Sequence, residues 1–146
     1  MKVRVQENPE QQEPEAIIVC RDADDAEVRR ALALLNQLEC KLIGKKDGTS
    51  VPVAVDEVLY FDSVDKQTFM YTETDVLEIP LRLYMLEERL SNGSFFRASK
   101  NTIINLNKIV SFKPEFGGRM EATLLNGERL MISRQYLPAL KSKLEM

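Results

Sequence analysis

The spacing of β-prone runs and tight-turn signals is the feature that most constrains the fold of this chain. Residue pairs that favour tight turns stand at Asp47-Gly48, Gly117-Gly118 and Asn126-Gly127, and the last suits a type I′ hairpin, in which both central residues have positive φ. Runs rich in β-branched and other apolar residues lie beside these turns, at residues 41–44, 51–55, 58–61, 68–71, 76–79, 109–113, 119–125 and 128–132. Short runs at such regular spacing predict antiparallel strands. We therefore expect residues 41–132 to be chiefly antiparallel sheet, in a mainly β fold that is α+β overall.

Two short helices are expected to interrupt and then to close this β region. Pro80 suits the first turn of a helix, because its fixed φ is already helical, and Asn92-Gly93 is expected to end that helix. Near the end of the chain, Ser133 is expected to cap a last turn or helix over residues 136–144.

The first 40 residues are expected to form a small strand-strand-helix cap in front of the β region. Residues 2–5 and 16–20 have strand-like patterns, and Asp22 or Asp24 is expected to cap a helix that runs to about Glu39. One face of this helix is an apolar stripe at helical spacing, formed by Val28, Ala31, Leu32, Leu35 and Leu38. The stripe either packs on the rest of the chain or pairs two copies of it. We therefore divide the chain into an N-terminal cap, residues 1–40, and a second domain, residues 41–146.

Residue types that the sequence lacks exclude several classes of function. It contains no histidine, which excludes Ser-His-Asp and Cys-His nucleophile systems, HExxH zinc sites and Cys2His2 zinc fingers. It also has no glycine-rich phosphate-binding loop, and its carboxylate pairs suit strand ends and helix first turns better than metal binding. We therefore expect no enzyme activity, no metal and no cofactor.

Apolar runs in this sequence are short. None approaches the roughly 18 residues of a membrane span, and the basic residues Lys2 and Arg4 precede no apolar stretch of a signal peptide. We expect a cytoplasmic protein without direct membrane insertion. Its two cysteines stand alone, without a CxxC pair, and are expected to be reduced thiols.

One stretch combines apolar anchors with a polar loop. Phe95 and Phe96 lead into the polar residues 97–102, and Ile103 and Ile104 then return the chain to the core. A polar loop held between buried anchors is how a rigid scaffold presents side chains to a partner. The arginine and lysine of this loop suit phosphate, and its asparagine can pair with the edge of an adenine.

Charge is distributed unevenly along the chain. The net charge is −3 overall, but residues 97–146 hold nine basic and four acidic side chains, a net charge of +5. Residues 1–40 and residues 41–96 each have a net charge of −4. A basic region of this kind attracts DNA even on an acidic protein, so charge and motif agree.

Three spaced blocks carry a resemblance to a known family. They are FFRASKNTIIN at residues 95–105, LNKI at residues 106–109, and NGERLMISRQYL at residues 126–137. Together they resemble the LytTR-type DNA-binding domain of bacterial transcription regulators, over roughly residues 40–144. The resemblance implies an elongated antiparallel β domain that reads successive major grooves of double-stranded DNA through loops.

The resemblance also implies partners. Such domains often bind paired repeats, which suggests a homodimer or paired binding, and some are controlled by a regulatory membrane protein. Residues 1–40 are too few for a phosphorylatable receiver domain, so we expect a stand-alone transcriptional regulator.

The resemblance assigns DNA contacts to three regions of this chain. They are the hairpin turn with Lys66, Gln67 and Thr68, the polar loop with Arg97, Ser99, Lys100, Asn101 and Thr102, and the segment Ser133, Arg134 and Gln135. Asn101 and Arg134 fall at positions where family members contact bases. Members often carry histidine where Thr68 and Lys100 stand, which leaves the target sequence open. Lys66, Arg97 and Lys100 are the side chains best suited to phosphate.

Two alternatives remain open at this point. In the first, Arg97 does not contact phosphate but forms a salt bridge to Glu87 or Glu88 that holds strand ends together. In the second, the whole chain acts without DNA, as a protein-interaction or ligand-sensing module on the same β scaffold, which its acidic first two-thirds would favour. Salt dependence separates DNA binding from this second alternative, because phosphate contacts weaken steeply as salt rises.

Overall fold

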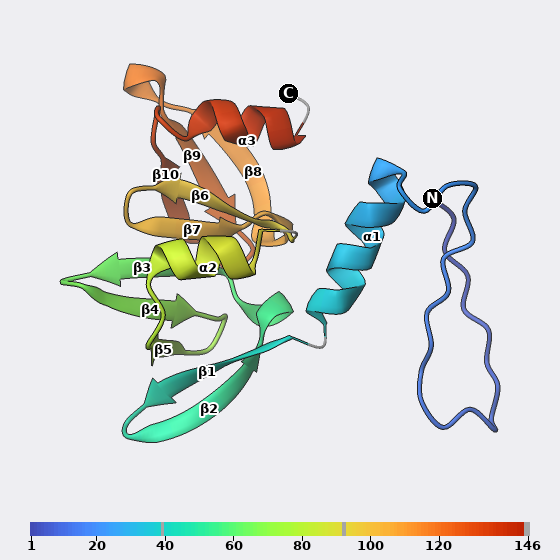
Figure 1. The fold of residues 1–146 in the computed structure, drawn as a ribbon. Helices are drawn as coiled ribbons and strands as arrows, with labels where there is room; N and C mark the ends of the chain where they lie inside the picture. The colour runs from blue at the N-terminus through green and yellow to red at the C-terminus, as the bar shows by residue number, and fades with distance from the viewer. Residues whose placement is uncertain (39, 92, 145–146) are drawn as a thin grey trace.

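The computed structural model describes residues 1–38, 40–91 and 93–144, and these contain ten strands and three α-helices (Figure 1). The strands are β1 Lys41–Lys46, β2 Thr49–Ala54, β3 Tyr60–Val64, β4 Gln67–Tyr71, β5 Val76–Ile79, β6 Phe95–Ser99, β7 Thr102–Asn105, β8 Ile109–Pro114, β9 Met120–Leu124 and β10 Arg129–Ile132. The helices are α1 Ala26–Gln37, α2 Leu83–Arg89 and α3 Leu137–Leu144. The 3₁₀ turns are η1 Val55–Glu57, η2 Leu106–Lys108 and η3 Phe116–Gly118.

The strands form two antiparallel sheets. The seven-stranded sheet has the order β2-β1-β5-β4-β3-β7-β6, and the three-stranded sheet has the order β10-β9-β8. Stacked along one axis, the two sheets give the domain an elongated shape (Figure 1). The predicted mainly β architecture with a short helix after Pro80 is therefore confirmed. Residue Asn92 of the expected helix-ending pair lies outside the described residues.

The hairpin of β6 and β7 separates two hydrophobic clusters. Phe95 and Ile103 point toward α2 on one face, whereas Phe96 and Ile104 point toward the three-stranded sheet and α3 on the other. Successive side chains of a strand point to opposite faces, so each aromatic or aliphatic pair contributes one residue to each cluster. All four side chains are buried, with at most 9% of their surface exposed. The predicted anchors thus fix both ends of the polar loop between them.

Two hairpins turn through residue pairs in which both φ angles are positive. Asp47 and Gly48 join β1 to β2 in this way, as the sequence predicts. Asp65 and Lys66 likewise join β3 to β4. The two strands pair as far as Val64 and Gln67, so they are longer than the runs 58–61 and 68–71 suggest and the turn between them has only two residues. The type I′ prediction for Asn126-Gly127 is wrong, because only Gly127 has a positive φ there. The Gly127 N–H bonds to the Leu124 carbonyl at 2.9 Å, which makes a three-residue loop with the glycine at its end.

The N-terminal cap differs from the expected strand-strand-helix unit. Residues 2–5 and 16–20 form no strands, and their side chains are exposed apart from half-buried Ile18. Two isolated strands without an apolar partner surface bury too little to hold a sheet. The helix is present as α1, but its cap is Asp25, whose carboxylate accepts a hydrogen bond from the Glu27 N–H at 2.8 Å. The expected helix end at Glu39 lies outside the described residues.

Within the described ranges, no helix is long and apolar enough to cross a membrane.

Candidate nucleic-acid interface

Hydrogen bonds between backbones bring the three predicted contact regions to one edge of the molecule. The Ser133 N–H donates to the Ala98 carbonyl at 2.8 Å, and the Ser63 N–H donates to the Asn101 carbonyl at 2.8 Å. The first bond joins the segment after β10 to β6, and the second joins the β6–β7 turn to β3. In Figure 1 the β3–β4 turn, the β6–β7 turn and the segment after β10 lie on the side of the domain opposite α1.

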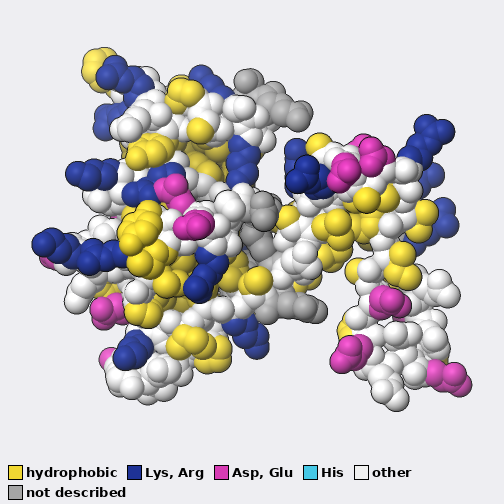
Figure 2. All heavy atoms as spheres, in the orientation of Figure 1, with side chains coloured by type: hydrophobic (Ala, Val, Ile, Leu, Met, Phe, Trp, Pro, Cys, Tyr) yellow, Lys and Arg dark blue, Asp and Glu magenta, His cyan; other side chains and the backbone are white. Residues whose placement is uncertain are grey.

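Basic side chains gather along the same edge. Figure 2 shows lysine and arginine side chains from the β8–β9 turn near the top of the view to the β1–β2 hairpin near the bottom. Acidic side chains lie among them at several points in the middle and lower parts of that view. We call this row of turns the basic edge: the β1–β2, β3–β4, β6–β7 and β8–β9 turns and the segment after β10, with the exposed residues Lys66, Lys100, Arg119 and Arg134. Phosphate groups of a nucleic acid are attracted to a surface of this kind.

The β3–β4 turn presents two of its three predicted residues. Lys66 and Gln67 are exposed, and Lys66 has a φ of 67°, which is strained for a residue with a side chain. Thr68 is only 4% exposed, because it lies on the inward face of β4. A DNA contact by Thr68 stays a prediction, and the side chain that would make it is buried in this structure.

The β6–β7 turn presents Lys100 and Asn101 to solvent. The Asn101 N–H donates to the Ser99 hydroxyl oxygen at 3.2 Å, so Ser99 shapes the turn. The Thr102 hydroxyl is 3.3 Å from the Asp62 carboxylate and bonds across to β3. Of the residues predicted in this loop, Lys100 and Asn101 are thus the ones whose side chains extend freely outward.

Arg97 lies mostly below the surface. Its side chain is 19% exposed and forms a salt bridge with Glu87 of α2. The Arg97 Nε also donates to the Ser99 carbonyl at 2.8 Å, and an Nη atom donates to the Lys100 carbonyl at 2.6 Å. The structure thus shows the salt bridge to Glu87 that the sequence left open.

The segment after β10 presents Arg134 and Gln135, which are exposed. The Ser133 hydroxyl is buried and bonds to no other described group, so it does not cap α3 as expected. Backbone bonds from Tyr136 and Leu137 to the Ser133 carbonyl, each at 3.1 Å, turn the chain into α3 instead. A Cβ added to Gly118 would lie 3.1 Å from the Arg134 Cδ, so the β8–β9 turn packs against this arginine.

One further basic residue, Arg82, lies beside a predicted contact residue although the sequence analysis did not single it out. This exposed residue and Lys66 line the same cleft of about 230 Å³ beside the β3–β4 turn. Neither the turn signals nor the resemblance pointed to Arg82, because it approaches Lys66 only through the pairing of β4 with β5.

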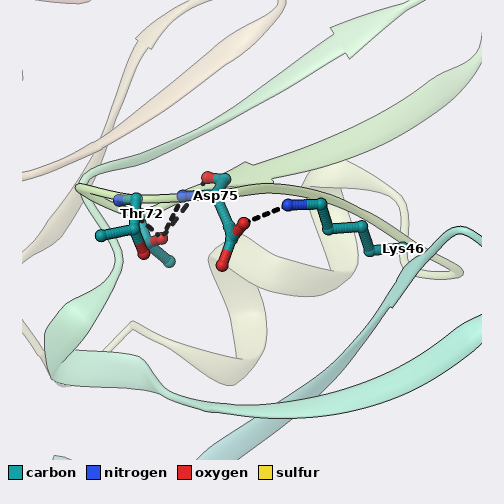
Figure 3. Close-up of polar contacts among 4 residues, drawn as sticks. Lys46, Thr72 and Asp75 are labelled. Atoms are coloured by element: carbon teal, nitrogen blue, oxygen red, sulfur yellow. Dashed lines mark hydrogen bonds and ion pairs between the residues drawn. The ribbon is translucent and has the colours of Figure 1, made fainter.

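Lys46 is a basic residue near the same edge whose charge is already paired. It forms a salt bridge with Asp75, and the hydrogen bond and charge of that carboxylate raise the pKa of Lys46 (Figure 3). The Asp75 N–H in turn donates to the Thr72 hydroxyl at 3.0 Å. The salt bridge between Lys46 and Asp75 ties the end of β1 to the β4–β5 turn, so we assign Lys46 a structural role.

The sequence of this chain is similar to those of known regulatory proteins. The chain is 25% identical over 92 residues to the sensory transduction protein LytT of Enterococcus faecalis, covering 63% of this chain and 38% of that protein. It is 28% identical over 71 residues to the transcriptional regulatory protein YpdB of Escherichia coli K12, covering 49% of this chain and 29% of that protein. The chain therefore spans less than half the length of these curated relatives.

A solved structure shares the fold. It is the LytTr DNA-binding domain of a putative methyl-accepting/DNA response regulator from Bacillus cereus, with a TM-score of 0.70 and 25% identity. The similarity covers 74% of this chain and 99% of that one. The family model of the LytTr DNA-binding domain matches residues 48–145, which is more than half of the chain. This protein therefore belongs to the LytTR family of DNA-binding, non-enzymatic domains.

Proposed function

We propose that this protein binds specific double-stranded DNA sequences as a bacterial transcriptional regulator in the cytoplasm, and that the turns of its basic edge enter successive major grooves. Arg134 and Asn101 read bases, because a guanidinium fork matches guanine O6 and N7 and an amide matches the adenine edge. Lys66 and Lys100 contact phosphates, since an ammonium on a flexible stem acts as a point charge.

The observation that carries this proposal is the rigid connection between the turns. The bonds from Ser133 to Ala98 and from Ser63 to Asn101 hold Arg134 and Asn101 at a set separation. Base readout needs such fixed spacing, because a side chain must meet its base edge in good hydrogen-bond geometry. Gln135 is exposed beside Arg134, and Gln67 is exposed beside Lys66, so both amides suit further contacts with DNA.

Two linked measurements test the proposal. The first is selection of bound duplexes from a random library, which should yield one preferred sequence. The second is the salt dependence of affinity for that sequence, which should fall steeply if several phosphate contacts form. A protein-interaction or ligand-sensing module would select no duplex, and its affinity for a partner would change little with salt. That outcome would replace DNA binding by the alternative function.

The N-terminal segment, residues 1–40, is proposed to pair two copies of the chain and not to contact DNA. Its net charge of −4 is repelled by phosphate. Helix α1 and Leu38, the residue after it, also expose apolar side chains, with 44% of Leu32, 37% of Leu35 and 54% of Leu38 accessible. A regulatory membrane partner stays a prediction of the family resemblance, with no residue of this chain assigned to it.

Removal of residues 1–40 tests this pairing. The shortened chain should sediment as a monomer and keep its affinity for a single half-site, whereas the full chain should sediment as a dimer. Leu35→Gln in the full chain is the milder variant, and it should weaken the dimer while leaving the β domain folded. Loss of half-site affinity in a folded shortened chain would show that the segment contacts DNA.

A further inference from the structure

Arg97 of β6 is bonded through all three of its guanidinium nitrogens. Its Nε donates to the Ser99 carbonyl at 2.8 Å, one Nη donates to the Lys100 carbonyl at 2.6 Å, and the other Nη bonds to the Glu87 carboxylate. A guanidinium has five N–H groups in a rigid planar fork, so these three partners fix the plane of the group. With 19% of the side chain exposed, little of it is open to a partner.

The two carbonyls that Arg97 holds belong to the residues immediately before Asn101. The pairing of β6 with β7 shifts register between Arg97 and Ser99, which leaves an irregular backbone in this stretch. Asn101 itself is held on both sides, because its N–H donates to the Ser99 hydroxyl at 3.2 Å and its carbonyl accepts from the Ser63 N–H at 2.8 Å. Arg97 thus supplies the bonds that set the irregular part of the loop.

Glu87 connects this loop to helix α2. Residue Glu87 lies on α2, which packs on the opposite face of β6 and β7 from the three-stranded sheet through buried Leu83 and Leu86. The carboxylate is 45% exposed, and it counters the charge of a guanidinium that lies close to the basic edge. An acidic side chain at this place opposes DNA binding by charge alone. Its presence is explained if it acts on the loop through Arg97.

We propose that Arg97 is a positioning residue and not a phosphate contact, and that Glu87 orients it so that the β6–β7 turn presents Lys100 and Asn101 to DNA. The proposal rests on the proposed DNA-binding function. It corrects the assignment of Arg97 as a phosphate contact, and it gives Glu87 a role in recognition although Glu87 does not touch DNA.

The loss of a negative charge and the loss of loop positioning predict opposite effects of Glu87→Gln on DNA affinity, which makes this variant the decisive one. Removing a negative charge should leave affinity for random duplex unchanged or slightly higher. If Glu87 positions the loop, the same variant should lower affinity for the selected sequence by roughly tenfold, the loss that goes with one weakened base contact. Glu88→Gln removes the same charge from the neighbouring exposed residue of α2 and is the matched control, for which no loss of selectivity is expected.

Arg97→Lys completes the test, because it keeps the positive charge but loses the planar fork. It should lower affinity for the selected sequence by roughly tenfold and leave the slope of affinity against salt unchanged. Lys100→Ala, in contrast, should reduce that slope by about one contact. The positioning role is overturned if Arg97→Lys binds as the wild type does while Arg97→Ala weakens binding to every sequence and reduces the slope.

Amide hydrogen exchange of the DNA-free protein gives a readout that does not depend on DNA. In Glu87→Gln and Arg97→Lys, the backbone N–H of Asn101 should exchange faster than in the wild type, whereas Glu88→Gln should leave its exchange rate unchanged. Equal exchange rates in all four proteins would overturn the positioning role. If the wild type selects no duplex, the proposed function fails, and the exchange rates alone then decide whether Arg97 and Glu87 hold the loop.

Discussion

Tyr60 donates its phenolic proton to the Glu128 carboxylate at 2.7 Å, and this bond crosses from the larger sheet to the loop before β10. The Tyr60 ring also stacks on Tyr71, with ring centroids 4.2 Å apart. The second Glu128 oxygen accepts a hydrogen bond from the Asn126 amide at 2.7 Å, so both carboxylate oxygens are bonded. Because Arg134 is on one side of this junction and Asn101 on the other, the contact helps to fix the spacing of the proposed readers.

Tyr60→Phe should lower the free energy of unfolding by about 1–2 kcal/mol, because it removes a hydrogen bond to a charged group while keeping the stacked ring. Denaturant unfolding measures this change. Tyr84→Phe is the control, since Tyr84 is 65% exposed and its substitution should have almost no effect. Equal stability of Tyr60→Phe and the wild type would show that the bond contributes nothing net.

Alkaline pH should destabilise the protein through the same tyrosine. Burial first, and then the hydrogen bond to Glu128, raise the pKa of Tyr60 above its ordinary value of 10.0. Above about pH 10 the unfolded chain releases the phenolic proton while the native protein keeps it, so the free energy of unfolding falls as pH rises. Below about pH 10 the contribution of Tyr60 is complete and constant.

Unfolding measured between about pH 9 and pH 11 should therefore show a steeper loss for the wild type than for Tyr60→Phe. Burial also raises the pKa of Tyr71, so the variant should keep part of the slope. Parallel curves for the two proteins would remove Tyr60 from the alkaline transition.

Lys66→Gly should make the protein more stable and a weaker DNA binder. It places glycine at the second position of the Asp65 turn, where φ is positive, and should relieve about 1 kcal/mol of strain. It also removes a proposed phosphate contact, so affinity for all duplexes should fall and the salt slope should decrease by about one. Lys66→Ala is the matched control, with the same loss of affinity but no gain in stability. A Lys66→Gly protein that binds DNA with undiminished affinity would exclude Lys66 from the interface.

Gly118→Ala should reduce sequence selectivity, because the added Cβ would lie 3.1 Å from the Arg134 Cδ and displace that side chain. Gly117→Ala controls for backbone strain: its φ of 82° is as unfavourable for alanine, but no atom of the described residues lies within 4 Å of its added Cβ. Each variant should lose roughly 1–2 kcal/mol of stability. Only Gly118→Ala should weaken binding to the selected sequence beyond that, and equal binding by the two variants would contradict the packing argument.

Arg134→Ala and Asn101→Ala should each cost roughly 1–3 kcal/mol on the selected sequence and change binding to random duplex very little. Lys100→Ala should instead weaken binding to all sequences alike. Since all three side chains are exposed, melting temperatures should stay close to that of the wild type. If Arg134→Ala loses equal affinity on both kinds of DNA, Arg134 is a phosphate contact, and if it loses none it is outside the interface.

The sequence by itself determined the local elements of the β domain and the family. Turn chemistry at Asp47-Gly48 placed one hairpin, and the apolar pairs Phe95-Phe96 and Ile103-Ile104 marked the buried anchors of another. These features depend on residues close together in the chain, so their physical causes are visible in the sequence. The β6–β7 loop was identified for the same reason.

Only the tertiary structure decided which side chains of the predicted contact regions reach solvent. Arg97 and Arg134 both stand in predicted contact regions, but α2 brings Glu87 to Arg97, whereas Arg134 is exposed. Residues 2–5 and 16–20 have the pattern of strands, yet no strand in the described part of the chain pairs with them. Pairing partners, salt bridges and burial are set by segments distant in the chain, whose approach depends on the packing of the whole domain and not on local preference.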